Sequence, residues 1–307
     1  MSYMQAEKKR RISFWEDGDA LMRLIFINVM VFVILIFIKI VYQLTPINLE
    51  LYQTQILDWI GMPADLSEFI KKPWVLITHM IAHHSVWQLL GNMLFLWAFG
   101  FLLQDLIGNR HIVPIYVYGG LAGAAFFVAS ANLLPGFRAT IESFTFFGAS
   151  ASVMAIAIAA TVTAPDYRVF PMINGGIPLW VITLIYVIID FAGLASSAFP
   201  YHLSHLAGAG MGYLYIRLIR NGQHPGEWMH QLYNWFINLF NPNKTVEKKS
   251  FKKEVFYNTK GQQPFTRTPN VNEQRVDAIL DKISRSGYQS LSQEEKDILK
   301  KAADNEG

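Results

Sequence analysis

A serine and a histidine stand near the heads of two apolar segments of this sequence. Ser150 comes two residues after Gly148 at the start of one segment, and His205 lies near the start of another. A hydroxyl in an apolar helix can hydrogen-bond to a carbonyl one turn earlier, so the serine alone indicates little. An ionisable side chain in a membrane helix is costly and marks a candidate functional site. Together the two residues are the parts of a nucleophile and its general base.

The segment over 77–103 is the most polar of the apolar segments. Its polar residues are Thr78, His79, His83, His84, Gln88 and Asn92. His84, Gln88 and Asn92 follow one another at intervals of four, so a helix would place them on one face. Donors on one face near a nucleophile can stabilise a developing oxyanion. The alternative is that they only hydrogen-bond between helices, as polar residues in membrane bundles do.

The histidines leave metal or haem binding open as a second chemistry. His79 and His83 are four residues apart, and His202 and His205 are three apart. Both spacings can ligate a metal or a haem. The zinc-protease signature His-Glu-x-x-His is absent, however, and Asp190 is the one membrane-segment carboxylate available for a hard-metal site. We therefore expect neither a metal nor another cofactor.

Composition indicates that membrane helices carry these residues. The chain is 52% hydrophobic and only 16% charged, whereas soluble domains carry about a quarter charged residues. It has no cysteine, which excludes disulfides and thiolate chemistry. Runs that can cross ~30 Å of hydrocarbon lie over 22–43, 77–103, 111–134, 146–164, 178–195 and 201–219. The sequence thus predicts an all-α polytopic membrane protein with six transmembrane helices and a small cytoplasmic helical hairpin.

The distribution of basic residues sets the expected orientation. Residues 8–11 are all basic and precede the first helix, and Arg217, Arg220 and many lysines follow the last, so both termini are expected in the cytoplasm. The helices over 146–164 and 201–219 then both begin at the outer side. Ser150 and His205 each lie about four residues into their helices, which places both roughly 6 Å below the outer surface.

Four regions are expected along the chain. They are a cytoplasmic N-terminal segment (1–21), a six-helix membrane domain (22–222), an interfacial helix with a basic linker (223–271) and a cytoplasmic helical hairpin (272–307). Apolar and aromatic residues at helical spacing predict interfacial helices at 56–60 and at 228–240. In the hairpin, a stripe of Val276, Ile279, Leu280 and Ile283 ends at Gly287 as C-cap, and Ser292 to Glu295 form a capping-box pattern.

Three motifs resemble those of the rhomboid family of intramembrane serine proteases, over about residues 20–220. Residues 148–151 match the Gly-x-Ser-x nucleophile motif, and residues 205–212 match His-x-x-Gly-x-x-x-Gly with Gly208 at its first glycine. The polar pattern from Thr78 to Asn92 matches the family's second helix. The three motifs in this order are specific, whereas any one alone would be weak. The 272–307 segment is similar to a cytoplasmic extension of some bacterial members.

The resemblance implies a rhomboid-type serine endopeptidase with a Ser–His dyad and no aspartate. Ser150 would attack a peptide carbonyl, and His205 would accept its proton and pass it to the leaving amine. Asn92 matches the family's oxyanion-hole asparagine, assisted by Gln88 and the backbone N–H of Ser150. His83 would support the first loop and water access. The other supporting positions are Gly148, Met154 and Gly208.

The resemblance also implies where and on what the protein acts. Substrates would be membrane proteins whose transmembrane helices unwind near the outer face and enter past the 178–195 helix. The chain would be a multi-pass protein of a bacterial inner membrane, with its active site opening to the outer side. Membrane lipids are its expected surroundings and nucleic acid is not an expected partner, while the oligomeric state stays open.

Three positions depart from the family's pattern. Gln88 stands where many members have a histidine, Ala151 replaces a glycine, and Met154 replaces a tyrosine that packs on the imidazole. None removes a catalytic group, because an amide can still donate and a thioether can still pack on a ring. Two rival functions remain beside the protease. One is a catalytically inactive relative that binds transmembrane helices for trafficking or quality control, and the other is a haem or metal protein using His83 or His205.

Overall fold

A computed structural model describes the chain over residues 19–45, 49–169, 175–239 and 271–304. The chain divides into two compact units, Met1–Lys244 and Thr245–Gly307, which are described separately. The basic residues 8–11 and almost all of the expected 241–271 linker lie outside the described residues.

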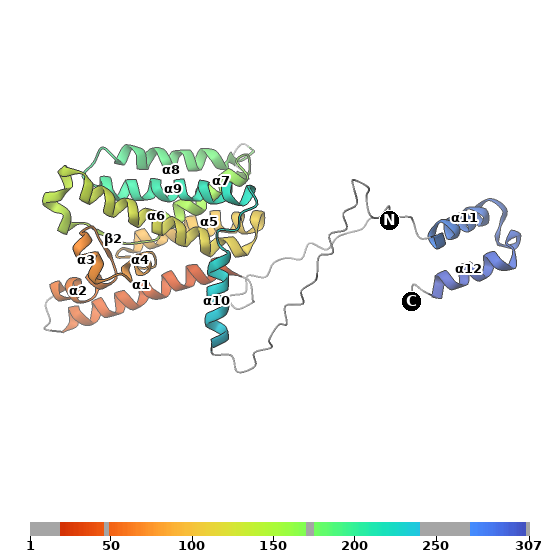
Figure 1. Ribbon diagram of the computed structural model, residues 1–307, viewed down its shortest axis with the longest axis horizontal. Coiled ribbons are helices and arrows are strands. Elements are labelled where there is room, and N and C mark those ends of the chain that lie inside the picture. Colours follow the sequence, from red (N-terminus) through yellow and green to blue (C-terminus); the bar gives the residue numbers. More distant parts are fainter. Residues whose placement is uncertain (1–18, 46–48, 170–174, 240–270, 305–307) are drawn as a thin grey trace, which may run out of the picture. The chain divides into compact units, whose positions relative to one another are not determined.

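The first unit is a bundle of long helices, which confirms the predicted all-α polytopic fold. Its main helices are α1 (Ala20–Leu44), α5 (Val86–Ile107), α6 (Ile112–Leu133), α7 (Ser150–Thr163), α8 (Leu179–Gly193) and α9 (Phe199–Arg220). In Figure 1 they run alongside one another. Within the described residues, three helices are long and apolar enough to cross a membrane, at 20–44, 86–107 and 109–133, and α7 and α8 are shorter apolar helices.

Short elements fill the connections of the bundle. Between α1 and α5 these are α2 (Leu49–Gln55), the 3-10 turn η1 (Leu57–Trp59), β1 (Met62–Pro63), α3 (Leu66–Lys71) and α4 (Val75–Thr78). The later ones are η2 (Asn109–His111), η3 (Pro135–Ser143), β2 (Thr145–Phe146), β3 (Arg168–Val169) and β4 (Ile177–Pro178). Strand β1 pairs antiparallel with β2, and β3 with β4. The pairing of β1 with β2 brings the long first connection to the segment just before Ser150.

The predicted interfacial helix at 56–60 is wrong in its extent, because only the 3-10 turn of η1 forms there. Tertiary contacts hold this segment instead. The Trp59 ring stacks on Trp74 at 5.7 Å between centroids. The Trp74 indole N–H also donates to the Trp59 carbonyl at 2.9 Å. The first connection is therefore fixed by contacts across the loop rather than by helix formation.

The second membrane helix begins later than the sequence predicts. The helix expected over 77–103 is α5, which starts at Val86, and residues 79–85 form a separate connection after α4. Other parts of the chain satisfy this connection's backbone: Tyr116 donates its hydroxyl to the Met80 carbonyl at 2.7 Å, and Gly148 donates its N–H to the His79 carbonyl at 2.9 Å. His84 therefore precedes the helix, and the predicted shared face holds only for Gln88 and Asn92.

The fourth membrane helix also begins later, at Ser150 rather than at 146. Thr145 and Phe146 pair with β1 instead, and Gly148 has φ +104°, a left-handed conformation that ends the strand before the helix starts. Ser150 is thus the first residue of α7, while His205 lies six residues beyond the start of α9. The prediction that Ser150 and His205 lie at equal depth assumed that both are about four residues into their helices, and this assumption is wrong.

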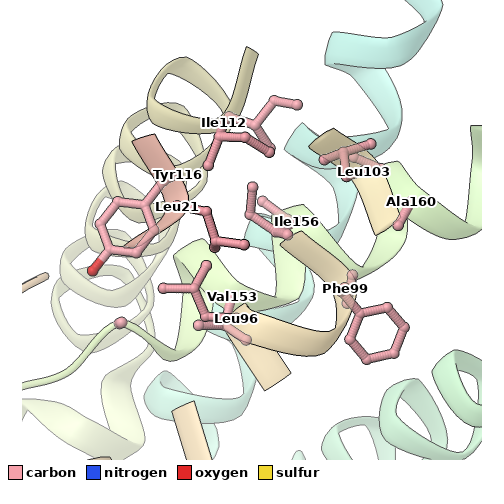
Figure 2. Close-up of a cluster of buried hydrophobic side chains, with 14 of the residues drawn as sticks. Leu21, Leu96, Phe99, Leu103, Ile112, Tyr116, Val153, Ile156 and Ala160 are labelled. Atoms are coloured by element: carbon pink, nitrogen blue, oxygen red, sulfur yellow. The ribbon is translucent and has the colours of Figure 1, made fainter. Parts of the chain in front are cut away.

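A hydrophobic core joins α1, α5, α6 and α7. Figure 2 shows Leu21 of α1 facing side chains of the other three helices, among them Leu96, Ile112 and Val153. These four side chains are almost fully buried. Leu89 and Met93 of α5 belong to the same core.

Small residues let α7 and α9 approach closely. A Cβ on Gly208 would overlap the Ala151 carbonyl oxygen, and one on Gly212 would overlap the carbonyl oxygen of Ala155. This confirms the predicted small-residue packing of the His205 helix against the Ser150 helix. The contact passes through Ala151 and Ala155, so Ser150 lies beside the seam rather than in it.

Helix α10 (Glu227–Leu239) confirms the helix predicted over 228–240, and in Figure 1 it runs across the direction of the bundle. Its start is attached to the bundle by the Trp228 indole N–H, which donates to the Tyr118 hydroxyl at 2.6 Å, and by Arg110, which lies 3.0 Å from Glu227. Trp228 and Trp235 stay more than half exposed. The placement of α10 at a membrane surface stays a prediction.

The second unit contains α11 (Val271–Ser286), η4 (Tyr288–Ser290) and α12 (Gln293–Asp304), as the hairpin prediction requires. Gly287 ends α11 with φ +75°. Ser292 and Glu295 form the predicted capping box, because the Ser292 N–H donates to the Glu295 carboxylate at 2.7 Å and the Glu295 N–H to the Ser292 hydroxyl at 3.3 Å. Ile279 is buried within this unit, whereas Leu280 is 48% exposed.

The hairpin should loosen in acid through Glu295. A hydrogen bond from Lys282, followed by that from the Ser292 N–H, lowers the pKa of the Glu295 carboxyl. A lowered folded-state pKa contributes stability that is present above the unfolded-state pKa and is lost as pH falls through the folded-state pKa. We expect Glu295→Gln to speed amide hydrogen exchange over 292–296 at pH 7, and acidification to do the same in the wild-type chain. The neighbouring Glu294→Gln is the control, and equal exchange in both variants would contradict the assignment.

Candidate active site

A cavity of about 880 Å³ brings together the residues singled out in the sequence. Ser150 of α7, His205 of α9, Gln88 and Asn92 of α5, and His83 from the connection before α5 all line it. Residues of α1, α2, α8 and β2 are also part of its wall. Within the described residues no hydrogen bond joins Ser150 to His205. The two side chains therefore line one cavity without a hydrogen bond between them.

The position of Ser150 at the helix start gives it backbone donors. The first N–H groups of an α-helix have no partner within the helix, and Ser150 is the first residue of α7. The N–H of Ala149, just before it, donates to Nε2 of His83 at 3.4 Å. Ser150 is buried, with 8% of its surface exposed. Its hydroxyl thus lies at a helix N-terminus, where a developing negative charge is favoured.

Two side-chain amides flank the turn that precedes Ser150. The Gln88 amide donates to the Phe147 carbonyl at 2.8 Å, and Nδ2 of Asn92 lies 2.9 Å from Nε2 of His83. A Cβ on Gly148 would lie 2.7 Å from the Gln88 amide nitrogen and 3.4 Å from that of Asn92. Each amide nitrogen carries two protons, so each keeps one for a further acceptor. Glycine at 148 is what leaves room for both amides.

His83 holds the amide of Asn92 in place. Its ring is buried, and Nε2 faces both Asn92 and the N–H of Ala149. Both partners are donors, so Nε2 acts as the acceptor in both contacts. His83 therefore connects α5 to the start of α7.

The imidazole of His205 has a carboxylate on one side. Its Nδ1 lies 2.8 Å from Oδ1 of Asp190 on α8, and Nδ1 of His202 lies 2.8 Å from the same oxygen. The Phe146 ring lies beside the His205 imidazole, with 6.4 Å between ring centroids. The sequence predicted a dyad without an aspartate, and the structure places Asp190 against His205.

Sequence reasoning considered Asp190 and His202 only as metal ligands. The sequence signal for a role of Asp190 is that it is a single carboxylate inside an apolar helix, where a buried charge needs a partner. The ligand atoms of Asp190, His202 and His205 lie within 4.8 Å of one another, so these residues could also hold a divalent metal. The 2.8 Å distances from Nδ1 of each histidine to Oδ1 of Asp190 are hydrogen-bond distances.

The remaining residues near the site pack against other parts of the bundle. Gly208 packs on the backbone of Ala151, the residue after Ser150. Met154 is fully buried in α7, and its packing on the imidazole stays a prediction. The Tyr201 hydroxyl donates to the Thr145 carbonyl at 3.2 Å, which ties α9 to the strand before Ser150.

Two parts of the chain match known protein families. Residues 71–222 match the rhomboid domain. This chain belongs to the rhomboid family. The matched range includes α5 to α9 and therefore all residues of those helices that line the cavity. Residues 267–305 match a second family, DUF6576, whose function is unknown.

Two curated relatives carry rhomboid names. Rhomboid protein 1, mitochondrial, of Saccharomyces cerevisiae is 29% identical over 154 residues, which are 48% of this chain and 42% of that protein. Presenilin-associated rhomboid-like protein A, mitochondrial, of Danio rerio is 27% identical over 150 residues, 46% of this chain and 36% of that protein. The chain thus matches less than half the length of either relative.

Proposed function

We propose that this chain is an intramembrane serine endopeptidase that hydrolyses peptide bonds in or near transmembrane helices of membrane proteins. One observation carries the proposal: a serine at a helix N-terminus, a histidine and two side-chain amides line one cavity inside a membrane bundle. Those groups are a nucleophile, a base and oxyanion donors. Membership of the rhomboid family supports the same reaction class.

In the proposed reaction, Oγ of Ser150 attacks the carbonyl carbon of the scissile peptide while its proton passes to Nε2 of His205. The new Oγ–C bond moves the carbonyl π electrons onto oxygen. The N–H of Ser150 and the amides of Asn92 and Gln88 donate to this oxyanion. When it collapses, the C–N bond breaks and His205 gives the proton to the leaving amine. Water then attacks the acyl-enzyme in the same way and frees Ser150.

The proposal includes the location of the site. Both termini lie in the cytoplasm of a bacterial cell, the bundle spans the inner membrane, and the cavity opens toward the outer side. Single-helix membrane proteins are the proposed substrates, and the exposed apolar face of the bundle contacts lipid. The basic residues in the last turn of α9, Arg217 and Arg220, support this orientation.

The experiment is to incubate detergent-purified protein with reporters that each carry one transmembrane helix, and to map new chain ends by mass spectrometry. Cleavage at a defined bond inside or beside the helix is expected. The absent Ser150–His205 hydrogen bond favours a second candidate, a helix-binding protein without catalysis. That candidate predicts co-purification of the same reporters with no new ends.

Asn92 is expected to act as an oxyanion donor. Asn92→Ala should lower kcat for reporter cleavage by roughly 10²–10³, the usual loss for one such donor, with KM little changed. The control is Gln104→Ala, which removes another buried amide of α5 that contacts Asn109 at 3.0 Å. An unchanged kcat in Asn92→Ala would reassign this amide to packing.

A further inference from the structure

The carboxylate of Asp190 is the one feature of the site that a Ser–His pair does not need. It is 3% exposed on the apolar helix α8, where an ionised group is costly. Among the described residues, its ion-pair partners are His202 and His205, and neither lysine nor arginine joins them. Its second oxygen, Oδ2, is buried with no hydrogen-bond partner. Oδ1 of this carboxylate therefore contacts two imidazoles of α9.

The contact determines which nitrogen of His205 can act as a base. An ionised carboxylate only accepts hydrogen bonds, so Nδ1 of His205 must carry the proton that it donates to Asp190. In a neutral imidazole, Nε2 is then the acceptor. That tautomer is the one that can take a proton from the Ser150 hydroxyl.

The same carboxylate also joins two helices. His202 shares Oδ1 of Asp190 with His205. A Cβ on Gly193, one turn after Asp190, would run into the His202 ring. Asp190 and Gly193 thus face α9 together, and the ring of His202 lies against this side of α8. Both imidazoles therefore hold Asp190 through the same oxygen, Oδ1.

We propose that Asp190 is a positioning residue of the active site, which fixes the tautomer of His205 and stabilises its protonated form during the reaction. The proposal rests on the proposed function. When Ser150 Oγ–H loses its proton to Nε2 of His205, the imidazolium keeps its second proton on Nδ1, against Asp190. Asp190 itself stays ionised, and the proton leaves Nε2 for the amine when the C–N bond breaks. His202 keeps the carboxylate in place.

The first test reads the tautomer of His205 directly in the unreacted protein. The protein is labelled with ¹⁵N-histidine, and the His205 signals are assigned by their loss in His205→Asn. We expect a protonated Nδ1 and an unprotonated Nε2 in the wild type, and a shift toward the Nε2–H tautomer in Asp190→Asn. A wild-type Nε2–H tautomer overturns the proposal without any variant having to fold.

The second test separates positioning from helix docking. Asp190→Asn should lower kcat by on the order of 10²–10⁴, up to the loss seen for the carboxylate of soluble serine proteases, with KM within about threefold. His202→Ala leaves the Asp190–His205 pair and should lower kcat less than about tenfold. Equal losses in the two variants, or an unchanged kcat in Asp190→Asn, overturn the proposal. EDTA is present throughout, because the same three residues could take up a metal.

Failure of this inference can be told apart from failure of the proposed function. If wild-type protein cleaves no reporter but His205 carries its proton on Nδ1, the protease assignment fails and the Asp190–His205 contact stands. If reporters are cleaved and His205 carries its proton on Nε2, the protease stands and Asp190 has no positioning role.

Discussion

Ser150→Ala is expected to abolish labelling by a fluorescent fluorophosphonate and to lower kcat for reporter cleavage by at least about 10⁴. The alanine lacks the oxygen that forms the covalent bond, so the reaction loses its nucleophile while the cavity keeps its shape. His205→Ala should lose labelling as well, because the remaining hydroxyl has no base to take its proton. The two losses should not add, since nucleophile and base act in the same step.

Ser152→Ala is the matched control for this experiment. Ser152 lies in the same helix, is 1% exposed, and its hydroxyl is buried with no hydrogen-bond partner, so the variant removes one buried Oγ outside the cavity wall. It should label like the wild type. Labelling of Ser150→Ala at the wild-type level would mean that another residue reacts. If wild type and variants all fail to label while their thermal melting is intact, the helix-binding function becomes the better assignment.

The chemistry of the site was more predictable than its geometry. Ser150, His205 and Asn92 stand out because polar residues in apolar segments are costly, and the structure brings all three to one cavity. What failed were the starts of the helices at 77 and 146. Those segments are apolar enough to read as helix, but Tyr116, Gly148 and β1 satisfy their backbone from elsewhere in the chain. Such long-range partners leave no mark on local periodicity.

Asp190 illustrates the other limit of the sequence. Its burial in an apolar helix is visible from its neighbours, and so is the spacing of His202 and His205. The register of α8 against α9 decides whether the carboxylate meets a metal, a cation or an imidazole. That register depends on side-chain packing between two helices, for which a single sequence offers several solutions. The aspartate could therefore be flagged from sequence, whereas its partner could not.

The separation of Ser150 and His205 should depend on the contact between α7 and α9 at Gly208. Besides overlapping the Ala151 carbonyl oxygen, a Cβ there would lie 2.8 Å from the carbonyl carbon and 3.0 Å from Cα of Ala151. These are backbone atoms next to the nucleophile, which cannot rotate away as a side chain can. We expect Gly208→Val to lower the free energy of unfolding by about 3 kcal/mol, the upper part of the range for overpacked cores. It should also lower kcat by about 10² for each ångström that the helices separate.

Gly210→Val tests whether the steric clash is needed, and Gly212→Val tests whether the loss of activity depends on closeness to Ser150. Gly210 has nothing within 4 Å of its Cβ position, so its variant makes the same change in helix propensity without the clash, and should keep both stability and kcat. Gly212 meets the backbone of Ala155, one turn further from Ser150, so its variant should lose comparable stability but less activity. Stability is measured by thermal melting and denaturant titration in detergent, and kcat with the reporter. Equal stability of the Gly208 and Gly210 variants would mean that α7 and α9 do not meet at this seam.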